Sequence, residues 1–329
     1  MENQMNSEFS HSVCISVVIP CLNEEETLPR FYNEIHSVGE KMLEKHADIQ
    51  MIFVDDGSSD HTLNVIKSIR VTDKRVNYLS LSKNFGKDAA IYAGMKAATG
   101  DYLVVMDADL QDPPELILGM YDVVLSGNCD CVTARRINRE GEPVIRSICA
   151  RLYYKMIKRI SSIDLADGTR DFRLMTRQMA MAILNMTEIN RFTKGIFSWV
   201  GFKNHWIEYE NVERVAGQSK WTFWKLVLYS LEGIFSFSTL PLTLASFGGL
   251  LFFAIALLLV GLIIFRTLVY GDPVAGWPSL ACIIFTTSGL QLFTIGILGQ
   301  YLQKTYLETK RRPVFIVKES NISDLDIRG

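Results

Sequence analysis

The sequence predicts an α/β protein with a mainly parallel sheet, followed by an interfacial helix and two transmembrane helices. Short apolar runs alternate with helical segments over the first 135 residues, which is typical of strands and helices that share one sheet. Polar or acidic turns follow three of these runs. Closer to the C-terminus, residues 233–265 and 273–303 contain no charged side chain, and each segment exceeds the roughly 20 residues that cross a bilayer.

The elements of the α/β part follow from the apolar pattern. Continuous apolar runs indicate strands buried inside a parallel sheet. We expect such strands at residues 14–20, 51–54, 76–81, 102–106 and 131–134. We expect helices that end near residue 45, span 62–70 and 87–98, and begin after Pro113 and Pro114, since proline suits the first helical turn.

The pattern changes after Arg135. Residues 146–160 have a helical period, residues 204–212 alternate like a strand, and residues 313–318 could add an edge strand. Residues 222–231 are rich in aromatic side chains and precede an apolar segment, which favours a helix lying in a membrane interface. No element is assigned to residues 164–177.

Three polar turns fall at the ends of predicted parallel strands. They contain Asn23 after the first strand, Asp55 and Asp56 after the second, and Asp107 and Asp109 after the fourth. Ligands of such sheets bind at the carboxyl ends of the strands. The sequence therefore predicts a cleft at this edge of the sheet.

Asp107 and Asp109 are the candidate metal ligands. Two carboxylates at one strand end repel each other, and a divalent cation removes that conflict. Their hard oxygen atoms suit Mg²⁺ or Mn²⁺, which are often shared with the phosphates of a substrate. A D-x-D sequence by itself also occurs in solvated turns that cap a helix, so the metal assignment depends on the other motifs.

Composition limits the other possibilities. The net charge of −2 gives no basic surface for nucleic acid. The six cysteines lack metal-binding spacing and are expected to be reduced, and the five histidines form no cluster. Residues 1–12 are polar and contain no apolar core of a signal peptide, so the part that precedes the apolar segments is expected in the cytoplasm.

Lysine and arginine residues flank the two apolar segments on their outer sides, which places both long ends of the chain in the cytoplasm. This predicts a multi-pass protein of the plasma membrane. The expected organisation is a polar extension at 1–12, a cytoplasmic α/β domain with the predicted cleft at 13–220, an interfacial helix at 221–236, a two-helix transmembrane domain at 237–303 and a cytoplasmic tail at 304–329.

Eight motifs between about residues 14 and 317 together resemble glycosyltransferase family two, and within it the polyprenyl-phosphate glycosyltransferases, such as the bactoprenol glucosyltransferases and dolichol-phosphate mannose synthases. The motifs are S-V-V-I-P-C-L-N-E-E-E, V-D-D-G-S-S-D, N-F-G-K, M-D-A-D-L-Q-D-P-P-E, D-F-R-L-M-T-R, K-G-I-F-S-W-V-G, A-G-Q-S-K-W and Y-L-E-T-K-R-R-P. The resemblance implies a GT-A fold. One departure is the Thr169-Arg170 insertion between Gly168 and Asp171.

The resemblance also implies a reaction and roles for single residues. A nucleotide sugar, with UDP-glucose the first choice, would give its sugar to undecaprenyl or another polyprenyl phosphate, with inversion at the anomeric carbon. The catalytic residues would be Asp171, Asp109 and Arg214. The donor-binding residues would be Pro20, Asn23, Asp56, Lys87, Asp107 and Gln111. The residues near the acceptor or its phosphate would be Arg136, Arg146 and Lys220.

The implied partners are the nucleotide sugar, the lipid phosphate and the bilayer. A flippase and a second glycosyltransferase would then use the product to modify a cell-surface polysaccharide. The enzyme itself would form a homo-oligomer. UDP-N-acetylglucosamine and GDP-mannose remain open as donors. Three alternative functions fit the sequence less well. A processive polysaccharide synthase would carry Q-x-x-R-W, which is absent. A non-catalytic nucleotide-sugar binding protein would not need Asp107, Asp109 and Asp171. A flippase or channel would need a polar pathway.

Overall fold

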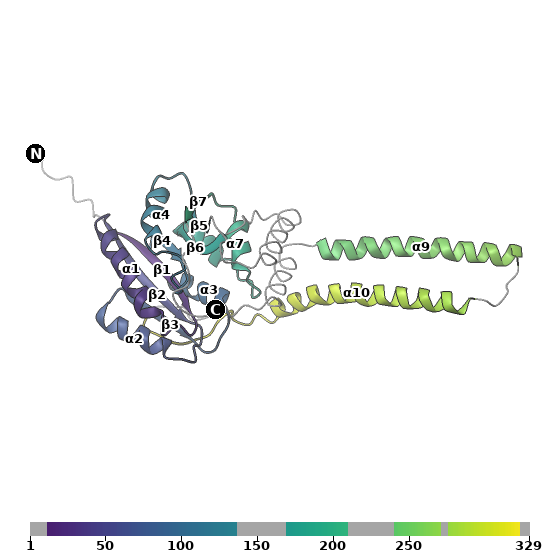
Figure 1. Ribbon diagram of the computed structural model, residues 1–329, viewed down its shortest axis with the longest axis horizontal. Coiled ribbons are helices and arrows are strands. Elements are labelled where there is room, and N and C mark those ends of the chain that lie inside the picture. Colours follow the sequence, from purple (N-terminus) through teal and green to yellow (C-terminus); the bar gives the residue numbers. More distant parts are fainter. Residues whose placement is uncertain (1–11, 137–168, 210–239, 271–275, 323–329) are drawn as a thin grey trace, which may run out of the picture.

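The computed structural model describes residues 12–136, 169–209, 240–270 and 276–322. Within these ranges, an α/β domain is built on an eight-stranded sheet, and two long helices extend from the domain side by side (Figure 1). The prediction of an α/β domain is confirmed.

The sheet has the strand order β7-β5-β6-β4-β1-β2-β3-β8. Its strands are β1 (Val13–Cys21), β2 (Ala47–Asp55), β3 (Val76–Leu81), β4 (Tyr102–Val105), β5 (Cys131–Arg136), β6 (Thr169–Thr176), β7 (Asn204–Tyr209) and β8 (Val317–Ser320). The strands β3, β2, β1 and β4 are parallel, and so are β5 and β7. Because β6 is antiparallel to both β4 and β5, and β8 is antiparallel to β3, the sheet is mixed, but its other six strands all run in one direction.

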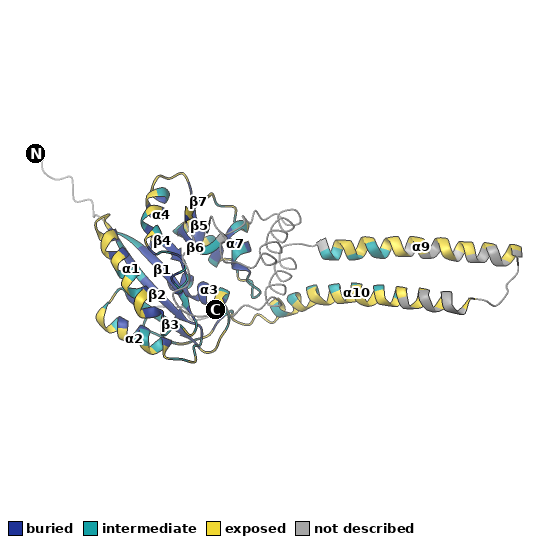
Figure 2. Ribbon diagram, in the orientation of Figure 1, coloured by how far each residue is buried: buried dark blue, intermediate teal, exposed yellow. Residues whose placement is uncertain are grey.

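Helices cover both faces of the sheet, as a sheet that is apolar on both faces requires. One face packs against α1 (Leu28–Leu43), α2 (Thr62–Thr72) and α4 (Leu116–Leu125). The other face packs against α3 (Lys87–Ala97), α6 (Arg177–Leu184) and α7 (Thr193–Trp199). The buried core therefore forms two layers, one on each side of the strands (Figure 2).

Successive residues of the central strands point to opposite layers, as the two-residue period of a strand dictates. In β1, Val17 and Ile19 belong to the layer under α1, whereas Val18 belongs to the layer under α3. Helix α3 lies very close to the sheet at Gly94, where an added Cβ would come 2.3 Å from a methyl carbon of Val18. Only a residue without a side chain fits at that contact.

The C-terminal end of the chain returns to the α/β domain. Strand β8 adds an antiparallel edge beside β3, so the expected edge strand exists, but it starts at Val317. Phe315 is fully buried and its ring packs edge-on against Tyr92 of α3. The segment expected as a separate cytoplasmic tail, 304–329, thus contributes part of the domain core.

The helices α9 (Leu240–Tyr270) and α10 (Trp277–Thr309) run side by side away from the sheet (Figure 1). A carboxylate oxygen of Glu308 accepts hydrogen bonds from the backbone N–H groups of Ile189, at 2.8 Å, and Asn190, at 3.3 Å. These bonds tie the end of α10 to the loop between α6 and α7. Many large apolar side chains of the two helices are exposed (Figure 2).

Over the residues that the structure describes, no helix combines the length and the apolarity that a bilayer crossing requires. The prediction of two transmembrane helices at 237–303 is therefore wrong. In α10 the apolar residues are interrupted by the polar side chains Thr286, Thr287, Gln291, Thr294 and Gln300. The predicted interfacial helix at 221–236, like the predicted helix at 146–160, lies outside the described residues.

Candidate active site

The turns that follow β1 and β2 are bonded to each other. The side-chain oxygen of Asn23 accepts a hydrogen bond from the N–H of Ser59 at 2.8 Å, and the N–H of Asn23 donates to the hydroxyl of Ser58 at 3.0 Å. Asn23 has a φ of 55°, which asparagine tolerates better than most residues. Pro20, also predicted to bind the donor, lies in β1 opposite Val54 of β2. The structure therefore brings these two predicted turns together at one edge of the sheet.

Asp56 is buried and holds the turn of the N-F-G-K motif. Its carboxylate accepts hydrogen bonds from the N–H groups of Phe85, at 2.7 Å, and Gly86, at 3.0 Å. Burial raises the pKa of Asp56, and the two N–H donors oppose that rise only in part. Gly86 has a φ of 99°, a conformation that favours glycine, and Lys87 begins α3 directly after it. Asp56 thus fixes the position from which Lys87 projects.

The turn after β4 carries the D-x-D pair. One carboxylate oxygen of Asp109 accepts a hydrogen bond from the N–H of Gln111 at 3.1 Å, and Leu110 between them has a φ of 56°. Both carboxylates are partly exposed, whereas Ala108 between them is buried. No group of three or more His, Cys, Asp or Glu side chains in the described ranges is arranged to hold a metal ion. A cation at this turn would therefore depend on oxygen atoms of a ligand in addition to these two carboxylates.

Lys87 joins two of the predicted site residues. Its ammonium nitrogen lies 2.7 Å and 2.8 Å from the two carboxylate oxygens of Asp107, and 2.5 Å from one oxygen of Asp171. The exposed fractions of the three side chains are 43% for Lys87, 23% for Asp107 and 13% for Asp171. A carboxylate at the end of β4 and another on β6 are therefore held together by one ammonium group that solvent still reaches.

Opposite charges dominate this group. Burial would raise the pKa of Asp171, but the positive charges of Lys87, Lys194 and Arg173 outweigh burial and hold the pKa well below its usual value. Burial would lower the pKa of Lys87, but Asp107 and Asp171 raise it above its usual value. Asp171 is therefore ionised throughout the neutral range, and it is a weak base as long as Lys87 remains in contact with it.

Arg173 supports the backbone beneath Asp171. It is buried, and its guanidinium group donates to the carbonyl oxygens of Arg170, at 3.0 Å, and Asp171, at 3.3 Å. The same group lies over the ring of Phe197 in α7, with its central carbon 3.7 Å from the ring centroid. Met175, two residues farther along β6, packs in the layer under α3. Asp171 and Arg173 share that face, as the alternation of an extended segment predicts.

Sequence reasoning assigned no role to Arg170 and Lys194. Arg170 donates to the side-chain oxygen of Gln111 at 3.0 Å and lies 3.8 Å from a carboxylate oxygen of Asp112, which also accepts a bond from the hydroxyl of Tyr209. Burial would lower the pKa of Arg170. The charges of neighbouring groups outweigh burial and raise this pKa, with Asp112 contributing most and Asp107 and Asp109 adding to it. The insertion next to Asp171 was the signal that could have identified this arginine.

Lys194 lies near enough to Asp171 to lower the pKa of that carboxyl, and it belongs to the K-G-I-F-S-W-V-G motif. That motif was the only sequence signal for it.

Several predicted site residues are not placed by the structure. Arg146, Arg214 and Lys220 lie outside the described residues. Arg136 is the last residue of β5, opposite Tyr209 of β7. Their assignments to catalysis or to phosphate binding stay predictions.

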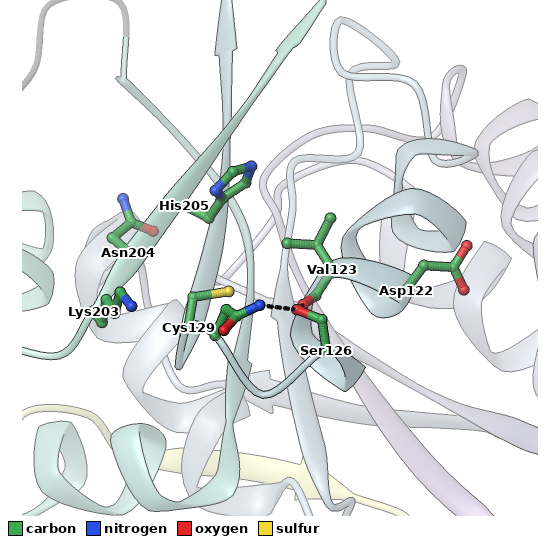
Figure 3. Close-up of a pocket in the computed structure, with 8 residues that line it drawn as sticks. Asp122, Val123, Ser126, Cys129, Lys203, Asn204 and His205 are labelled. Carbon is green, nitrogen blue, oxygen red and sulfur yellow. Dashed lines mark hydrogen bonds between the residues drawn. The ribbon is translucent and has the colours of Figure 1, made fainter.

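A separate open pocket of about 500 Å³ lies at the opposite edge of the sheet (Figure 3). It is formed where α4 ends and β5 and β7 begin. It is lined by Asp122, Val123, Ser126, Asn128, Cys129, Lys203, Asn204 and His205. None of the predicted site residues lines this pocket, so the candidate active site remains the group at the carboxyl ends of β1, β2 and β4.

Comparison with known proteins agrees with this site. The profile of the family described as "Glycosyl transferase family 2" matches residues 16–184, which includes the strands and turns that hold Asn23, Asp107 and Asp171. The chain belongs to this family. Its members are glycosyltransferases, so the protein is an enzyme that transfers a sugar, and its mixed α/β sheet agrees with the GT-A fold that the resemblance implied.

Similar family members share almost their whole length with this chain. The "Prophage bactoprenol glucosyl transferase homolog" of Escherichia coli (strain K12) is 40% identical over 92% of this chain and 98% of its own. The "SfII prophage-derived bactoprenol glucosyl transferase" of Shigella flexneri is 41% identical over 93% and 98%.

Among solved structures, glucosyl-3-phosphoglycerate synthase from Mycobacterium tuberculosis is 18% identical with a TM-score of 0.45, over 68% of this chain and 78% of that one. That likeness is too distant to identify a ligand.

Proposed function

We propose that this family 2 enzyme transfers a sugar from a nucleotide sugar to a polyprenyl phosphate, with glucose from UDP-glucose as the first choice. The observation that carries the proposal is the joining of Asp107, Lys87 and Asp171 at the edge of the sheet where such folds bind ligands. The acceptor and the sugar are suggested by relatives about 40% identical over nearly the whole chain that are named bactoprenol glucosyl transferases.

The residues at the D-x-D turn fit a divalent cation. Asp107 and Asp109 offer hard oxygen atoms in a partly exposed turn, and Mg²⁺ commonly binds through one or two carboxylates together with phosphates of the substrate. Such an ion, Mg²⁺ or Mn²⁺, would neutralise charge on the departing nucleotide diphosphate. Arg170, held by Gln111 beside the same turn, adds a fixed positive charge on the side where that diphosphate would lie.

Asp171 is assigned to the acceptor side. The second pKa of a phosphate monoester is about 6, so the lipid phosphate is already mostly ionised near neutral pH and needs little help from a base. The main task of Asp171 is then to orient the attacking phosphate oxygen for displacement with inversion. Once Lys87 no longer contacts it, Asp171 can also accept the last proton when the phosphate still carries one. The buried Arg173 fixes the backbone of Asp171 for this task.

The proposed acceptor places the reaction at a membrane. Its phosphate must reach the carboxylates while its hydrocarbon tail stays in lipid, so we place the enzyme at the cytoplasmic surface of the plasma membrane. A flippase and a second glycosyltransferase would then use the lipid-linked sugar to modify a cell-surface polysaccharide, and the enzyme would act as a homo-oligomer. What supports the use of the product by a flippase and a second enzyme is the chemistry of that product, which carries its sugar on a lipid anchor.

The test is transfer from a panel of nucleotide sugars to undecaprenyl phosphate, with the products identified by mass. We expect a hexose added from UDP-glucose. Transfer only from UDP-N-acetylglucosamine or GDP-mannose would change the assigned sugar and keep the acceptor. Asp109→Asn should lower the rate at least about a hundredfold, as the loss of an electrostatic centre usually does.

The matched control is Asp122→Asn, since Asp122 is an exposed carboxylate paired with Lys45, remote from the site. Absence of any lipid-linked product with the whole panel would refute the proposal.

A further inference from the structure

The ammonium group of Lys87 contacts the carboxylate of Asp107, which a metal ion would also use as a ligand. Its ammonium nitrogen lies within 2.8 Å of both oxygens of Asp107, the first residue of the D-x-D pair. A divalent cation coordinated by Asp107 would stand only a few ångströms from this ammonium group, and two positive charges at that distance repel strongly in a partly buried site. The lysine and the ion therefore compete for the same carboxylate.

The fold holds Lys87 in this position from two sides. On one side, Asp56 binds the N–H groups of Phe85 and Gly86, which fixes the turn that precedes the lysine. On the other side, Asp171 binds the ammonium at 2.5 Å and is itself fixed by Arg173 through the backbone. If the ammonium leaves Asp107, Asp171 remains as a second partner, so the lysine can release one carboxylate without losing its charge compensation.

We propose that Lys87 acts as an internal counter-cation that keeps Asp107 occupied until the nucleotide sugar arrives. This inference rests on the proposed function, because it concerns the binding of the donor at the same site. Before donor binding, the ammonium weakens the affinity of the D-x-D turn for a free divalent ion. A nucleotide diphosphate brings negative charge that the displaced ammonium can contact, so the ion and the diphosphate bind tightly only together. Lys87 is a positioning residue in this scheme, with Asp107 as its metal-side partner.

The experiment measures Mn²⁺ binding to the purified full-length protein by calorimetry or by the electron paramagnetic resonance of free Mn²⁺, first without nucleotide and then with UDP. We expect Lys87→Met to bind Mn²⁺ about tenfold more tightly than the unaltered protein when UDP is absent, since one nearby positive charge is removed. UDP should then raise the Mn²⁺ affinity of the variant much less than that of the unaltered protein.

Two lysine variants serve as controls. Lys87→Arg keeps the charge and should retain the weak affinity for Mn²⁺ in the absence of UDP. Lys83→Met removes a lysine from the same loop that contacts the ring of Phe85 instead of a carboxylate, and it should also leave Mn²⁺ binding unchanged. Lys87→Gln keeps a hydrogen-bond donor without the charge and replaces Lys87→Met if that variant does not fold, as judged by circular dichroism.

The added affinity must come from the D-x-D turn. Combining Lys87→Met with Asp107→Asn should therefore remove the gain. An Mn²⁺ affinity of Lys87→Met equal to or weaker than that of the unaltered protein, or a gain that persists without the Asp107 carboxylate, would overturn the inference. The Mn²⁺-binding measurements use neither a sugar donor nor a lipid. They can therefore be interpreted even if no sugar transfer is found, and a negative result for the competition between Lys87 and Mn²⁺ does not affect the transfer assay.

Discussion

The replacement Asp171→Asn separates a role in the reaction from a role in holding the fold. The change keeps the size of the side chain and removes its negative charge, so Lys87 retains only Asp107 as a charged partner. Hydrogen bonds to charged groups contribute about 1.5–3 kcal/mol to stability. Because Lys87 is 43% exposed, solvent screens its bond to Asp171, so losing that bond should cost an amount near the lower limit, about 1–2 kcal/mol. For a domain of this size that corresponds to a decrease in Tm of roughly 2–8 °C.

The rate should fall far more than the stability. We expect turnover to drop at least about a hundredfold, which equals about 2.7 kcal/mol of activation free energy, while UDP affinity changes little. Raising the pH from 5 to 7 should restore the rate of the variant by roughly tenfold, because the fraction of fully ionised acceptor phosphate rises from about 9% to about 91% when its pKa is about 6. The assay follows initial rates of transfer to undecaprenyl phosphate across this pH range.

The difference in stability between the unaltered protein and Asp171→Asn should also depend on pH. The pKa of Asp171 is lower in the folded protein than in the unfolded chain, so its ion pair stabilises the fold fully above the unfolded pKa of about 4 and less as the pH falls below it. Asp122→Asn, which removes an exposed carboxylate paired with Lys45, is the control and should change neither rate nor pH profile. A loss of UDP affinity in parallel with turnover and no recovery at any pH would show that Asp171 is structural.

Three further results are expected. Gly94→Ala should lower the free energy of unfolding by about 1–3 kcal/mol, because its Cβ would lie 2.3 Å from a Val18 methyl carbon, and adding Val18→Ala should recover part of the loss in a denaturant titration. Phe315→Ala should cost about 3–5 kcal/mol by the same measurement, since this fully buried ring joins the C-terminal strand to Tyr92, and an unchanged midpoint would contradict that packing. Excess chelator should abolish sugar transfer and either Mg²⁺ or Mn²⁺ should restore it, whereas full activity in chelator would refute a metal at Asp107 and Asp109.

Local sequence was sufficient for the central strands and for the edge that carries the site. Apolar runs bounded by polar turns identify β1, β2, β3 and β4, because a strand buried on both faces must be apolar at almost every position. The parallel direction of these strands then places Asn23 and Asp107 at one edge, as the structure confirms. Strand β6 could not be found in this way, since the charged residues Asp171 and Arg173 interrupt its apolar pattern.

The sequence by itself determined the α/β class, the catalytic family and the position of the D-x-D turn, because these depend on residue types close together in the chain. Only the tertiary structure decided which distant groups meet. Lys87 and Asp171 are 84 positions apart, and their contact exists because β6 inserts antiparallel beside β4. The tertiary structure also returned the C-terminal strand to the sheet. An apolar pattern indicates that a segment avoids water. Which surface covers that segment depends on contacts with residues that are distant in the sequence.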